Sequence, residues 1–111
     1  MAEAIGHFET VIRLKPDHAV AHYNLGSALM EDPSRSAEAA RHLEEAIRLQ
    51  PDYIAARFNL AVVLGEIPDR IPEAIEQVRE LIRLHPDMAP AKALLADLLA
   101  RQRAGSRPAS R

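Results

Sequence analysis

Hydrophobic residues recur along this chain at three- and four-residue steps, the spacing that places side chains on one face of an α-helix. Two such runs are Ala21, Leu25, Ala28 and Leu29, and Ala39, Leu43, Ala46 and Ile47. Short proline-containing segments separate the runs. The pattern therefore predicts an all-α domain of about six helices, in which short connections make neighbouring helices antiparallel.

The helical pattern repeats with a period of 35 residues. Aligning residues 17–51 with residues 52–86 without gaps gives 15 identities in 35 positions. Each period holds two helices, and a proline ends the second one because the residue before proline avoids helical angles. We therefore divide a repeat domain, residues 1–102, as follows: a half repeat at 2–16, full repeats at 17–51 and 52–86, and a half repeat at 87–102. Residues 103–111 are polar and contain glycine and proline, so we expect a disordered tail.

A Pro-Asp pair stands at every repeat boundary, and the aspartates are Asp17, Asp52 and Asp87. A short carboxylate can accept hydrogen bonds from the free N–H groups of a first helical turn. We expect these aspartates to be N-caps. Small residues recur within the helices, at Gly26, Ala61 and Ala96. A large side chain there would wedge a hairpin apart, so these positions predict close helix approach.

Composition excludes several functional classes. The chain has no cysteine, so disulfides and thiolate chemistry are excluded. The net charge is −2, and no basic face with interleaved aromatic residues indicates nucleic-acid binding. The sequence contains neither a signal peptide nor an apolar stretch of membrane-spanning length, so we expect a cytoplasmic protein that is not bound to membranes.

Candidate chemistry is sparse. His18 and His22 stand four residues apart, as two ligands on one helix would, but no third ligand follows at motif spacing. No nucleophile elbow, phosphate-binding glycine loop or paired-carboxylate pattern is present. The acidic residues are spread at the spacing of solvated helix faces. We expect no metal, no cofactor and no enzymatic activity.

The repeat resembles the tetratricopeptide pattern Trp-x2-Leu-Gly-x2-Tyr, Ala-x3-Phe, Pro. The first full copy reads His22-x2-Leu25-Gly26-x2-Leu29, then Ala39-x3-Leu43, then Pro51. The second reads Arg57-x2-Leu60-Ala61-x2-Leu64, then Ala74-x3-Val78, then Pro86. The resemblance covers residues 2–102. It departs from the family at the tryptophan position and in its period of 35 rather than 34.

The resemblance implies a short right-handed α-solenoid that acts as a protein-interaction scaffold and binds an extended or helical segment of a partner. The first helix of each pair would line a concave groove, and an Asn at the place of Asn24 or Asn59 would bond the backbone of a bound peptide. The expected groove residues are Tyr23, Asn24, Ser27 and Glu31; Phe58, Asn59, Val62 and Glu66; and Ala93, Leu94, Asp97 and Arg101. Glu31 and Glu66 would repel an acidic partner, so we expect a segment with apolar and some basic side chains.

The pattern leaves one helix without a partner at each end. A second helix at about 2–15 lacks a first helix, and a first helix at about 88–102 lacks a second. The apolar residues expected at these open ends are Ile5, Phe8, Ile12, Leu95, Leu98 and Leu99. Exposed apolar patches mark interfaces, so head-to-tail self-association into a homo-oligomer is one hypothesis. A longer array of which this chain is a fragment, or an isologous dimer through one end, stay open.

Overall fold

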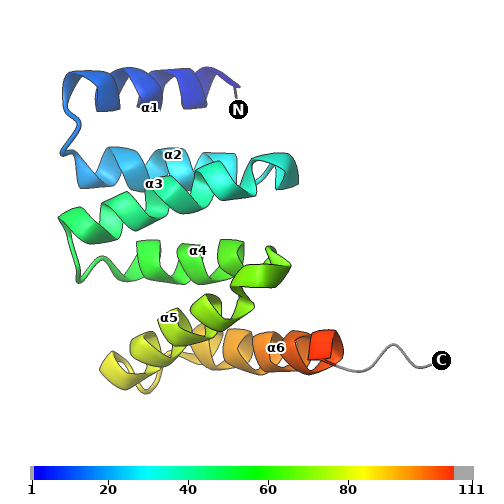
Figure 1. Ribbon diagram of the computed structural model, residues 1–111. Helices are drawn as coiled ribbons and strands as arrows, with labels where there is room; N and C mark the ends of the chain where they lie inside the picture. The colour runs from blue at the N-terminus through cyan, green and yellow to red at the C-terminus, as the bar shows by residue number, and fades with distance from the viewer. Residues whose placement is uncertain (1, 107–111) are drawn as a thin grey trace.

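A computed structural model describes residues 2–106 as a succession of helices (Figure 1). In chain order these are α1 (Ala2–Leu14), α2 (Ala19–Leu29), the 3₁₀ turn η1 (Pro33–Arg35), α3 (Ser36–Leu49), α4 (Ile54–Gly65), the 3₁₀ turn η2 (Pro68–Arg70), α5 (Ile71–Leu84) and α6 (Ala89–Ser106). The part of the chain that the structure describes contains no strand. The predicted fold class is confirmed: each helix packs antiparallel against the next in a single stack.

The stack is elongated, 52 × 33 × 19 Å, because each helix contacts mainly its neighbours in sequence. The core is therefore a continuous strip between helices rather than one central cluster. Its largest fully buried side chains are Leu25, Leu29, Leu43, Leu60, Val63, Leu64, Val78, Leu81 and Leu98. No helix within residues 2–106 is both long and apolar enough to cross a membrane.

The Pro-Asp pairs lie in turns, so the prediction that Asp17, Asp52 and Asp87 are N-caps was wrong. Backbone hydrogen bonds close the turns over 15–18, 50–53 and 85–88, with proline and aspartate at the two central positions. Proline suits the first central position because its φ is already set for a turn. The cap of α2 is consequently His18, whose Nδ1 accepts a hydrogen bond from the Ala21 N–H at 3.1 Å.

A 3₁₀ turn connects the first helix of each pair to the second. Proline begins both turns, where its missing N–H costs no hydrogen bond. Asp32 caps η1, and its carboxylate accepts bonds from the backbone N–H and the hydroxyl of Ser34, at 3.0 and 2.7 Å. These two hydrogen bonds lower the pKa of the Asp32 carboxyl. The turn therefore redirects the chain so that α3 packs back on α2.

The predicted close approach at Gly26 is present. A Cβ atom on this glycine would lie 2.7 Å from Cγ of Leu43 and 3.1 Å from the carbonyl oxygen of Ala39. The equivalent Ala61 is fully buried in the α4–α5 hairpin. Ala96, the third equivalent, is exposed, since no further helix within residues 2–106 packs on that side of α6. Small residues thus bring two helices together only where a second helix follows within the chain.

The C-terminal boundary differs from the prediction. Helix α6 continues to Ser106, so the expectation of disorder was wrong for residues 103–106. Gln102, Arg103 and Ala104 are good helix formers, and no turn sequence interrupts them. Residues 107–111, also predicted to be disordered, lie outside the described residues.

Candidate partner-binding face

The first helices of the repeats, α2, α4 and α6, carry the residues predicted to line a groove. Their exposures fall into two groups. Partly buried are Tyr23, Asn24, Ser27, Phe58, Asn59, Val62 and Leu94, whereas Glu31, Glu66, Ala93, Asp97 and Arg101 are exposed. A row of partly buried apolar and amide side chains edged by charges is the composition of a surface that can hold a peptide. We call this set of residues the first-helix face.

The two asparagines of the first-helix face are in different states. The Nδ2 group of Asn59 donates a hydrogen bond to the Ser27 hydroxyl at 2.9 Å, which joins α4 to α2. Asn24 makes no hydrogen bond through its side chain to another residue between 2 and 106. Its amide therefore keeps two donors and one acceptor for a ligand, while Asn59 keeps its carbonyl oxygen and one N–H.

Aromatic side chains form the apolar part of this face near α2 and α4. The rings of Tyr23 and Tyr53 lie 5.0 Å apart between centroids, at an interplanar angle of 35°. Burial raises the pKa of the Tyr53 hydroxyl, and the neighbouring Tyr23 raises it further. Sequence reasoning missed Tyr53, which stands just before α4. His18 and Met88 occupy the equivalent positions, and all three side chains are partly buried.

Charged side chains lie on the α6 side of the first-helix face. The guanidinium of Arg101 lies 2.9 Å from the Asp97 carboxylate and 3.6 Å from that of Glu66, and it donates to the Gly65 carbonyl oxygen at 3.1 Å. Two of the three predicted acids are therefore paired. Glu31 makes no ion pair within residues 2–106, so the negative charge of the face is concentrated at the C-terminal end of α2.

A polar pair links the two helices of each complete hairpin. Nδ1 of His22 lies 3.1 Å from Nδ1 of His42, and Nε2 of His22 lies 2.9 Å from the Pro16 carbonyl oxygen. In the next hairpin Arg57 donates to the Gln77 side-chain oxygen at 3.1 Å and to the Pro51 carbonyl at 3.0 Å. The residue at the tryptophan position of the repeat pattern thus makes hydrogen bonds to the second helix and to the preceding turn.

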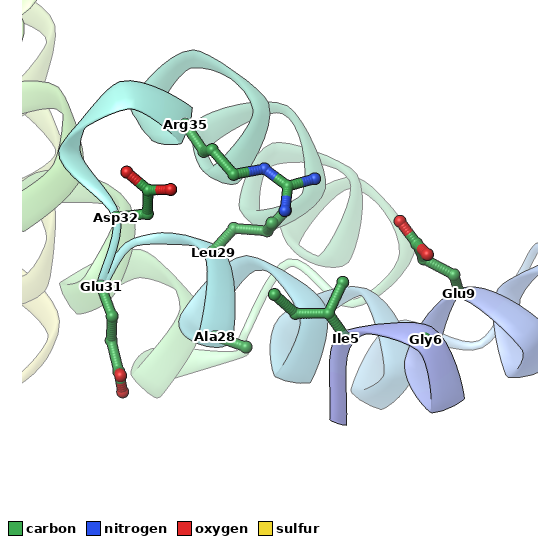
Figure 2. A pocket seen from close by; sticks show the side chains of 8 residues that line it. All are labelled: Ile5, Gly6, Glu9, Ala28, Leu29, Glu31, Asp32 and Arg35. Atoms are coloured by element: carbon green, nitrogen blue, oxygen red, sulfur yellow. The ribbon is translucent and has the colours of Figure 1, made fainter. Parts of the chain in front are cut away.

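A cavity of about 410 Å³ opens between α1 and the end of α2 (Figure 2). Ile5, Ala28 and Leu29 supply its apolar surface, and charged side chains surround it. The charge of Arg35 is paired within the protein, because its guanidinium donates two hydrogen bonds of 3.0 and 3.2 Å to the Glu38 carboxylate. Three carboxylates remain around the opening, those of Glu9, Glu31 and Asp32. No pattern in the sequence predicted this cavity.

The structure separates the predicted open-end residues into two kinds. Ile5, Phe8 and Ile12 on α1, and Leu95 and Leu99 on α6, are partly buried at the edges of the core. Leu98 is fully buried, so its assignment to an open face was wrong. It packs at Gly65, where an added Cβ would lie 2.6 Å from Cδ2 of Leu98. The reason is rotational: residue 98 is one position from Leu99, about 100° around the helix, and faces α4 and α5.

No group of three or more His, Asp or Glu side chains within residues 2–106 is placed to hold a metal ion.

The architecture of residues 2–106 defines the class of protein. It is an α-solenoid of helical hairpins whose first-helix face carries amide side chains. A family model described as tetratricopeptide repeat matches residues 2–34 and 33–64, which together span more than half of the chain. The chain belongs to the tetratricopeptide repeat family. A comparison with curated proteins finds no match. Repeats of this family generally mediate protein–protein interaction and are typically non-catalytic.

Proposed function

We propose that this protein binds an extended segment of a protein partner along the first-helix face. The observation that carries the proposal is the state of Asn24, which is partly buried on α2 with its side-chain hydrogen-bonding groups unused within residues 2–106. An amide can pair with both the N–H and the C=O of a peptide unit, so it recognises backbone whatever the ligand's side chains. The role is that of a non-catalytic scaffold.

The surroundings of Asn24 indicate the side chains of such a partner. Tyr23 and Phe58, each one residue before an asparagine of this face, offer partly buried aromatic surface, and Val62 contributes to a cavity of about 220 Å³. These features favour a segment with apolar side chains at alternate positions, because an extended strand presents every second residue to one side. Unpaired Glu31 favours a Lys or Arg at the end of the segment that lies over the C-terminal end of α2.

Selection of random peptides on the full chain, followed by titration of the selected peptides, tests this proposal. Asn24→Ala should weaken binding about threefold to tenfold, the effect of losing one or two backbone hydrogen bonds. Arg41→Ala, an exposed change on α3, should leave the affinity unchanged. Equal affinities for wild type and Asn24→Ala, or an equal loss in Arg41→Ala, would contradict the proposal.

A further inference from the structure

The outer side of α6 repeats the surface that α2 and α4 use to hold their second helices. Leu60, Ala61 and Leu64 are 2%, 0% and 1% exposed because α5 covers them. Their equivalents 35 residues later on α6 are more accessible: Leu95 and Leu99 are only partly buried, and Ala96 is exposed. The helix therefore carries a first-helix interface without a second helix packed on it.

The outer side of α1 also lacks a packed helix within residues 2–106. On α3, the side chains of Ala39, Leu43 and Ala46 are fully buried against neighbouring helices. Their equivalents on α1, which are Ala4, Phe8 and Val11, are only partly buried. Helix α1 packs on α2 but has no first helix on its other side within residues 2–106. Each end of the stack thus presents half of the same hairpin interface.

We propose that α6 of one copy packs on α1 of a second copy, in the antiparallel arrangement that α2 adopts on α3 and α4 on α5. In this register, residue n of the second copy takes the position n + 105, three periods further along. Ala96 then faces Phe8 of the second copy, as Gly26 faces Leu43. The contact is heterologous, so it builds a chain of copies or a ring. It is independent of peptide binding on the first-helix face.

Charge complementarity identifies a second copy as the occupant. Arg35 and Arg70 each hold a glutamate in the first turn of the second helix, Glu38 at 3.0 Å and Glu73 at 2.8 Å. Glu3 is the equivalent glutamate on α1, and it has no ion pair within residues 2–106. Arg103 is exposed and also unpaired there, and it lies one turn beyond Leu99 on the same face of α6. In the proposed register Arg103 takes the position of Pro33 and Pro68, two residues before that of Arg35 and Arg70, so it lies at the end of α6 that is near Glu3 of the next copy.

A second polar contact follows from the same register. The hairpin pairs His22–His42 and Arg57–Gln77 join residues 20 apart, at nitrogen–nitrogen and nitrogen–oxygen distances of 3.1 Å. The third equivalents are Lys92 on α6 and His7 on α1, and both are exposed. An ammonium donates and a neutral imidazole accepts, so Lys92 of one copy and His7 of the next can complete the series.

The cavity beside α1 lies where this contact ends. At the next junction of the stack, Met30 and Pro33 pack beside Val62, Val63 and Glu66, and the space left is about 220 Å³. The corresponding space between α1 and α2 is about 410 Å³. The last turn of α6 from a second copy would lie at the edge of this larger space, which adds Arg103 to the surroundings of three carboxylates.

Two charge reversals test the register without disturbing the core, since both side chains are exposed. Sedimentation of the wild type from about 10 μM to about 1 mM should show a mass that rises above 12.3 kDa with concentration and falls again in high salt. Glu3→Arg alone and Arg103→Glu alone should each weaken self-association about threefold to tenfold. Mixing the two variants should restore it, because every contact in the alternating assembly then joins opposite charges.

The outcomes separate this inference from its alternatives. A wild type that stays at 12.3 kDa over the whole range would overturn it. So would self-association of the mixture no stronger than that of the separate variants, which is the result expected of an isologous dimer through one end. Ala96→Gly provides an independent check, because it opens the space that Gly26 leaves for Leu43. This variant should self-associate more tightly, and weaker association would contradict the pairing of Ala96 with Phe8.

Discussion

The imidazole rings of His22 and His42 stack across the α2–α3 hairpin, with their Nδ1 atoms 3.1 Å apart and their ring centroids 5.3 Å apart. The Pro16 carbonyl oxygen can only accept, so Nε2 of His22 carries the proton that it shares with this oxygen. In the tautomer with the proton on Nε2, His22 accepts at Nδ1, and His42 donates from Nδ1. A proton on Nδ1 of both rings would place two N–H groups face to face.

This arrangement predicts stability that declines in mild acid. Burial lowers the pKa of His42, with repulsion from His22 as the next cause. The unfolded chain therefore takes up a proton at pH values near 6.5, where folded His42 is still neutral. The free energy of unfolding is highest above pH 6.5 and falls as the pH decreases through this value. Thermal unfolding midpoints between pH 8 and pH 5.5 should show the decline.

His42→Gln is the variant that isolates this effect, because Gln77 occupies the equivalent position in the next hairpin and accepts there from Arg57. The variant should have a flatter dependence of the midpoint on pH than the wild type. His85→Gln, at an exposed position in a turn, should keep the wild-type slope. An unchanged slope in His42→Gln would show that this pair is not the source of the acid sensitivity.

Gly26→Ala should destabilise the fold. Its new Cβ would meet the fully buried Leu43 at 2.7 Å and the Ala39 carbonyl at 3.1 Å, so the hairpin must open slightly. Overpacking of this kind costs about 1–3 kcal/mol. Gly6→Ala is the matched control, since a Cβ there meets nothing within 4 Å. It should be neutral or stabilise by about 0.5–1 kcal/mol, the usual gain of alanine over glycine in a helix. Urea unfolding of both variants gives the comparison, and equal losses would refute close approach at Gly26.

Neighbouring leucines on α6 should respond differently to truncation. Leu98 is fully buried against α4 and α5, so Leu98→Ala should cost about 2–5 kcal/mol of unfolding free energy. Leu99 is partly buried on the outer side, so Leu99→Ala should cost distinctly less in dilute solution, where the proposed contact between copies is weakest. Chemical unfolding at low protein concentration measures both. A larger loss for Leu99 than for Leu98 would contradict the placement of α6.

Arg70 connects consecutive repeats through charges. Its guanidinium binds Glu73 at the start of α5 and reaches Glu44 on α3 at 2.8 Å in both cases. Among the described residues Arg83 binds only Glu80, and its side chain is 67% exposed. Arg70→Ala should therefore lower stability by about 1 kcal/mol, a larger loss than that of Arg83→Ala, whose side chain is exposed. Thermal melts at low and high salt measure the difference, which should shrink as salt is added. No difference at low salt would show that the contact with Glu44 adds nothing.

The repeat period predicted most of the fold. In the two full repeats, core positions 35 residues apart share helical type and burial, so Leu25 and Leu60 could be placed in the core from their spacing. The N-caps were misplaced because Pro-Asp is favourable both before a helix and inside a turn, and the backbone bonds of residues 15–18 decide between them. Nothing local in the sequence distinguishes these two uses.

The surface was less accessible to sequence reasoning. Helical spacing assigned Asn24 and Asn59 to one face. It could not show that Asn59 donates a hydrogen bond to Ser27, whereas the Asn24 side chain makes no hydrogen bond within residues 2–106. The contact of Tyr53 with Tyr23 crosses between repeats and depends on how far a turn residue reaches. Leu98 was misassigned because apolar residues cover α6 on several sides, and which of them face neighbours depends on the packing of α4 and α5.

The central claim, that a partner segment lies along the first-helix face, is tested most directly by amide chemical-shift mapping of the labelled full chain with a selected peptide. We expect the largest shifts on α2 and α4, with the side-chain amide of Asn24 moving most and exposed positions of α3 and α5 unaffected. Shifts confined to α3 and α5, or to the outer sides of α1 and α6, would contradict the claim.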